Sequence, residues 1–152
     1  MLRNPLERFY SGYQHHMHDC RACVNEGPNK TTFADYVAKV GSLYAEYFGR
    51  GDADVAKKRI ETDFAFVGLV EHWGASVCLY HATFGGRAAS KVELRNLRPG
   101  GYEAPENLAS LRQGPGQGLG GHAAENLRRD FVVYAAGKSK FLSDLAARAG
   151  VD

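Results

Sequence analysis

The sequence predicts an α/β domain in which helices flank a parallel sheet, and three observations lead to this prediction. A capped helix starts close to residue 4. The apolar run at 63–73, bounded by charge and glycine, is typical of a buried strand in a parallel sheet. Helical patterns stand on both sides of this run, so helix, strand and helix alternate as they do in α/β folds.

The first helix is predicted from its capping residues. Asn4 is a favourable N-cap, Pro5 suits the first turn, and Glu7 stands three residues after the cap, as in a capping box. An apolar stripe at helical spacing follows, made of Leu6, Phe9, Tyr10, Tyr13 and Met17. The segment before this helix, Met1 and Leu2, would be the end of a strand.

The same helix has features of an anion site. Its polar stripe consists of Asn4, Arg8, Ser11 and His15. Arg3 stands just before the helix, where backbone N–H groups and the helix dipole already favour a phosphate. A guanidinium at Arg3 and a hydroxyl at Ser11, two turns along, can hold one phosphate from two sides.

The remaining elements are predicted from periodicity and breakers. Helices are expected over Phe33–Phe48, from Asp52 or Ala53 to Glu61, and from Val77 to Phe84, where Gly85-Gly86 ends the helix. Residues 88–121 are rich in Gly and Pro and predict a flexible loop. A long amphipathic helix is expected from about Ala123 to Arg148, and the tripeptide 137–139 inside it is not a phosphate loop, because that loop's first glycine would fall on Val132.

Composition sets broad limits on function. The 152 residues are enough for one domain with a hydrophobic core, and 44% hydrophobic and 24% charged residues are ordinary for a globular protein. A net charge of +2 provides no global field that would indicate nucleic acid, so an anion site has to be local. No apolar run approaches a membrane span, and we find no targeting segment.

The first segment resembles the 3′-phosphate-binding motif of Golgi-type carbohydrate sulfotransferases, such as the heparan sulfate 2-O-sulfotransferase-like enzymes. The matching residues are Arg3, Asn4, Pro5, Glu7, Arg8, Ser11 and Tyr13. The resemblance implies that Arg3 and Ser11 bind the 3′-phosphate of 3′-phosphoadenosine 5′-phosphosulfate, with no metal. It also implies transfer of the sulfuryl group to a hydroxyl, with a glycan as the expected acceptor, in the Golgi.

Two further stretches resemble this family. The segment from Phe64 to Glu71 is similar to a late strand, and Asp130, Tyr134 and Phe141 fit its terminal helix. Glu71 is either a functional group at a strand end or a carboxylate at a helix N-terminus. A basic loop of the family closes over the nucleotide, and Arg95 and Arg98 are the candidates for that role here.

The resemblance also implies that parts of the domain lie upstream of residue 1. These are the N-terminal strand, the 5′-phosphosulfate loop and the catalytic base, so the catalytic residue is unknown. Residues 1–152 are therefore predicted to be the C-terminal portion of one sulfotransferase domain with nucleoside-kinase-like architecture. A membrane anchor, if there is one, would also stand upstream.

Two other classes of function fit part of the sequence. One is a non-catalytic module that keeps the anion-binding helix without the chemistry. The other is a small zinc-stabilised adaptor, because His15, His18, Cys20 and Cys23 stand within nine residues. No second ligand pair follows at zinc-site spacing, and Cys20 or Cys23 can instead pair with Cys78 in a disulfide.

Overall fold

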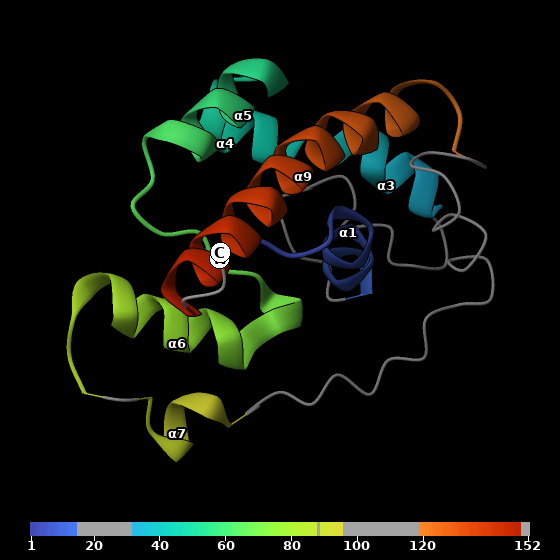
Figure 1. The fold of residues 1–152 in the computed structure, drawn as a ribbon. Helices are drawn as coiled ribbons and strands as arrows, with labels where there is room; N and C mark the ends of the chain where they lie inside the picture. Colours follow the sequence, from blue (N-terminus) through green and yellow to red (C-terminus); the bar gives the residue numbers. More distant parts are fainter. Residues whose placement is uncertain (15–31, 88, 96–118, 150–152) are drawn as a thin grey trace.

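The computed structural model describes residues 1–14, 32–87, 89–95 and 119–149, and within them the fold is mostly helical. The long helix α9 (Gly121–Ala149) runs through the molecule, and most of the other helices pack around it (Figure 1). α1 (Pro5–Gln14) and α3 (Phe33–Val40) lie against its first half. α4 (Leu43–Gly49), α5 (Ala53–Thr62) and α6 (Trp73–Phe84) also contact α9, and α7 (Lys91–Leu94) packs against α6.

The predicted α/β fold with a parallel sheet is wrong for the described residues. Only one isolated parallel bridge forms, between Leu2 and Leu69, with Leu2 N–H donating to the Gly68 carbonyl at 2.7 Å. The pairing stops there because α1 begins at Pro5 on one side and a 3₁₀ turn, η1 (Val70–His72), begins on the other. The run at 63–73 is apolar because residues 67–69 are buried against helices, rather than because it is a strand within a sheet.

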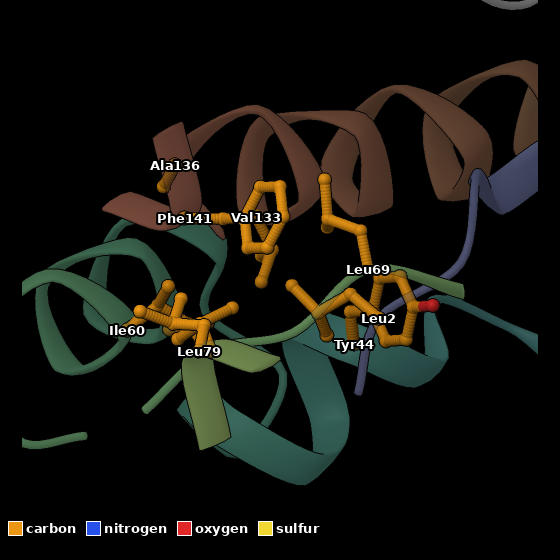
Figure 2. Packing of buried hydrophobic residues seen from close by; sticks show 10 residues of the cluster. Leu2, Tyr44, Ile60, Leu69, Leu79, Val133, Ala136 and Phe141 are labelled. Atoms are coloured by element: carbon orange, nitrogen blue, oxygen red, sulfur yellow. The ribbon is translucent and has the colours of Figure 1, made fainter. Parts of the chain in front are cut away.

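Two hydrophobic clusters hold the helices together. The larger one surrounds the Leu2–Leu69 bridge, and Figure 2 shows its side chains from α4, α5, α6 and α9 converging there. The second lies between α1, α3 and the first turns of α9, where Phe9, Val37 and Leu127 are fully buried. Four residues of the apolar stripe predicted for α1 pack here as expected, with Leu6 and Phe9 buried and Tyr10 and Tyr13 at the edge, whereas Met17 lies outside the described residues.

Most of the predicted helices are confirmed, with one break. α5, α6 and α9 cover the predicted segments within a few residues, and residues 137–139 lie inside α9, as the rejection of a phosphate loop requires. The single helix predicted over 33–48 is instead two helices. Gly41 ends α3 with φ of +78°, a conformation that glycine adopts at little cost, and Ser42 starts α4.

Candidate functional site

The candidate site is the segment that enters α1, where the sequence predicts an anion. Asn4 Oδ1 accepts the Leu6 N–H at 3.0 Å, so the predicted N-cap is confirmed. The backbone N–H of Asn4 donates to the carboxylate of Glu71. A carboxylate of the chain itself therefore contacts the helix end that would attract a phosphate.

Arg3 and Ser11 lie along one side of α1 with a carboxylate between them. The Arg3 Nε atom is 4.0 Å from Glu7 Oε2, and the Arg3 side chain remains 40% exposed. Ser11 is half-buried and stands one helical turn beyond Glu7, which places their side chains on the same face. To hold a phosphate together with Ser11, the Arg3 guanidinium would exchange its loose contact with Glu7 for the ligand.

The sequence allows Glu71 to be either a functional group at a strand end or a carboxylate at a helix N-terminus, and the structure favours the second. It lies in η1, outside any sheet, and its carboxylate reaches the N-terminus of α1 rather than that of its own following helix. Tyr134 on α9 lies close enough to this carboxylate to be affected by its charge. Burial, followed by the negative charges of Glu71 and Glu7, raises the pKa of Tyr134 to about 12. The Tyr134 phenol therefore keeps its proton at physiological pH.

Arg8 does not belong to the polar face on which its spacing places it. Its Nη2 atom lies 2.5 Å from Asp130 Oδ2, and Asp130 on α9 is fully buried. Its guanidinium carbon stands 4.1 Å above the centre of the Tyr44 ring, an arrangement typical of a cation–π contact. Arg8 is thus an internal ion-pair partner, and a phosphate at Arg3 would not use it directly.

Asp130 joins three helices through its two oxygens. Oδ2 accepts from Arg8 of α1, and Oδ1 accepts the Ser42 hydroxyl at 2.6 Å and the Tyr44 N–H at 2.8 Å. These donors belong to the first turn of α4, so Asp130 caps that helix from a residue 86 positions away. We define Arg8, Ser42, Tyr44 and Asp130 as the buried polar cluster.

The contact of Tyr44 with Arg3 was not predicted from the sequence. Periodicity predicts Tyr44 only as a core residue of a continuous helix, and the residue is indeed 93% buried. Its hydroxyl also bonds the backbone of Arg3, 41 residues away. The signal that could have drawn attention here is the pair Gly41-Ser42, a helix stop followed by an N-cap residue.

The other predicted site residues do not join this segment. Arg95 is exposed at the end of α7, which lies at the edge of the molecule away from α1 in Figure 1. Arg98 and the zinc candidates His15, His18, Cys20 and Cys23 lie outside the described residues. Cys78 is exposed on α6. Within the described ranges, no group of three metal-ligating side chains is placed to hold an ion.

Comparisons with known proteins add no family. No family model, curated protein or solved structure matches the chain. In the part of the chain described by the structure, no helix is both long and apolar enough to cross a membrane. The sulfotransferase resemblance therefore stays a prediction that depends on the motif residues.

Proposed function

We propose that this chain takes part in sulfuryl transfer from 3′-phosphoadenosine 5′-phosphosulfate to a hydroxyl group, for which a glycan is the expected acceptor. Its own contribution is to bind the 3′-phosphate through Arg3 and Ser11. The proposal covers donor binding and assigns no catalytic base, so nucleotide binding is its first test.

One observation carries this proposal: among the residues that the structure describes, the Arg3 guanidinium at the entry to a capped helix has no hydrogen-bonded carboxylate partner. The Glu7 carboxylate lies 4.0 Å from its Nε atom, beyond hydrogen-bonding distance, and 40% of the Arg3 side chain faces solvent. A phosphate dianion is a better ligand for a guanidinium than this contact, because bidentate charge-assisted hydrogen bonds are short and strong. Arg8, by contrast, is already bonded inside the protein.

Nucleotide binding tests the proposal directly. Calorimetry with adenosine 3′,5′-bisphosphate should give a measurable Kd, and adenosine 5′-phosphate should bind more weakly. Arg3→Ala should weaken bisphosphate binding by about 2 kcal/mol, roughly thirtyfold, because a charge-assisted contact is lost. Arg128→Ala is the matched control, since Arg128 is an exposed arginine on α9 paired with Glu125. An unchanged Kd in Arg3→Ala would contradict the assignment.

A parallel transfer assay separates the alternatives of other classes. Nucleotide binding without sulfate transfer from the donor to a glycan would favour the non-catalytic module. Metal analysis after dialysis tests the hypothesis of a zinc-stabilised adaptor. That hypothesis predicts that the protein retains zinc and does not bind either nucleotide.

A further inference from the structure

A single hydroxyl holds both polar groups of the Arg3 backbone. The Arg3 N–H donates to Tyr44 Oη at 2.8 Å, and Tyr44 Oη donates in turn to the Arg3 carbonyl, also at 2.8 Å. Because the two bonds lie on either side of the Cα atom, they fix the direction in which the Arg3 side chain leaves the backbone. Hydrogen bonds within α1 do not fix the Arg3 backbone, since Arg3 precedes the first residue of that helix.

The Tyr44 side chain is itself held firmly. Tyr44 is 93% buried, and the Arg8 guanidinium covers one face of its ring, with the guanidinium carbon 4.1 Å from the ring centre. Arg8 is fixed by Asp130, which also accepts the backbone N–H of Tyr44 at 2.8 Å. The backbone and the ring of Tyr44 are therefore both anchored to α9, and its hydroxyl is presented to Arg3 as a fixed point.

We propose that Tyr44 is a positioning residue for anion binding, and that it sets the direction of the Arg3 guanidinium toward the 3′-phosphate. This role rests on the proposed function. An arginine side chain loses conformational entropy when it binds a phosphate. A backbone that is already fixed lowers the total entropy cost of binding, because fewer torsion angles remain to be ordered. Tyr44 acts through Arg3 and does not touch the ligand.

The protonation state of Tyr44 agrees with this arrangement. Burial raises the pKa of the Tyr44 phenol, while the hydrogen bond to the Arg3 backbone and the charge of Arg8 act in the opposite direction with smaller effect. The hydroxyl therefore keeps its proton at neutral pH and can donate to the Arg3 carbonyl.

Tyr44→Phe tests the proposal, because it removes the hydroxyl and keeps the ring beneath Arg8. We expect the Kd of adenosine 3′,5′-bisphosphate to rise about tenfold, the loss of one well-made interaction, while that of adenosine 5′-phosphate stays unchanged. In an Arg3→Ala background, the same substitution should have no further effect on bisphosphate binding. Tyr47→Phe is the matched control, since Tyr47 lies on the same helix and is 72% exposed.

The outcomes distinguish the two proposals. If the unmodified chain binds both nucleotides equally or neither of them, the 3′-phosphate site is overturned, and the role of Tyr44 with it. If it prefers the bisphosphate and Tyr44→Phe retains that preference, or weakens both nucleotides alike, only the role of Tyr44 is overturned.

A second variant covers the case in which Tyr44→Phe does not fold. Arg8→Lys keeps a cation for Asp130 and removes the planar group that lies over the Tyr44 ring. A selective loss of bisphosphate affinity is again expected, about threefold because the hydroxyl remains. An unchanged preference for the bisphosphate in this variant would overturn the role of Tyr44.

Discussion

Two parts of the molecule join their helices with polar contacts in different surroundings. The buried polar cluster ties α1 and α4 to α9 around Asp130, which is fully buried. The contact between α6 and α7 uses His81 and Glu93, whose Oε1 atom lies 3.0 Å from Nε2 of the histidine, and the Glu93 side chain is 37% exposed. The two contacts differ in solvent exposure, so their comparison predicts how solvent changes the contribution of such bonds to stability.

Solvent changes what happens when a partner is lost. Water can replace a missing partner at Glu93, whereas an uncompensated charge in the interior has no such replacement. The buried polar cluster should therefore control global stability, and the contact between α6 and α7 should control only local attachment.

Removing Asp130 should have the largest effect. Asp130→Ala leaves Arg8 largely buried without its partner and leaves the first turn of α4 without its cap. We expect the free energy of unfolding to fall by about 3 to 5 kcal/mol, measured by urea denaturation. The control on the same helix is Glu125→Gln, which breaks an exposed pair with Arg128 and should leave the urea midpoint nearly unchanged. Equal midpoints for the two variants would remove the distinction between the regions.

Removing one of several donors to Asp130 should cost less. Ser42→Ala deletes the hydroxyl that donates at 2.6 Å to Oδ1, while Tyr44 N–H and Arg8 remain. A loss of about 1.5 to 3 kcal/mol is expected, since the acceptor is charged and the site is buried. Thermal and urea unfolding measure it, with the exposed Ser143→Ala on α9 as control. A loss as large as that of Asp130→Ala would mean that Ser42, rather than the ion pair, dominates the cluster.

Acidification should release α7 without unfolding the molecule, and this is the smallest effect. Hydrogen bonds from the Ser90 side chain and backbone, then from His81, lower the pKa of Glu93 from 4.5 to about 2. Because the folded pKa is depressed, the attachment is fully present above about pH 4.5 and is lost as the pH falls toward about 2.

The fluorescence of Trp73 reports this change. Its Nε1 donates to the Glu93 carbonyl at 2.7 Å, and it is the single tryptophan of the sequence. Far-UV circular dichroism followed in parallel shows whether the remaining helices persist. In Glu93→Gln the emission should no longer change over this range. A change that coincides with global unfolding in both proteins would contradict a local release.

The helices could be predicted because their signals are local. Asp52 caps α5 through its own side chain, and Gly85 ends α6, so both boundaries follow from neighbouring residues. The sheet could not be predicted correctly, because an apolar run such as 63–73, of which only residues 67–69 are buried, is compatible with a strand or with an extended segment packed against helices. What covers such a run depends on distant residues.

The candidate site also has features that could be predicted from the sequence and features that could not. The sequence by itself determined the capped start of α1, with Asn4 as cap and Arg3 before it, because N-cap chemistry acts over three or four residues. Only the tertiary structure decided that Arg8 turns inward to Asp130, that Glu71 reaches the end of α1, and that Tyr44 holds the backbone of Arg3. Those contacts span 41 to 122 positions, and no local pattern encodes which buried charge or hydroxyl a folded chain brings together.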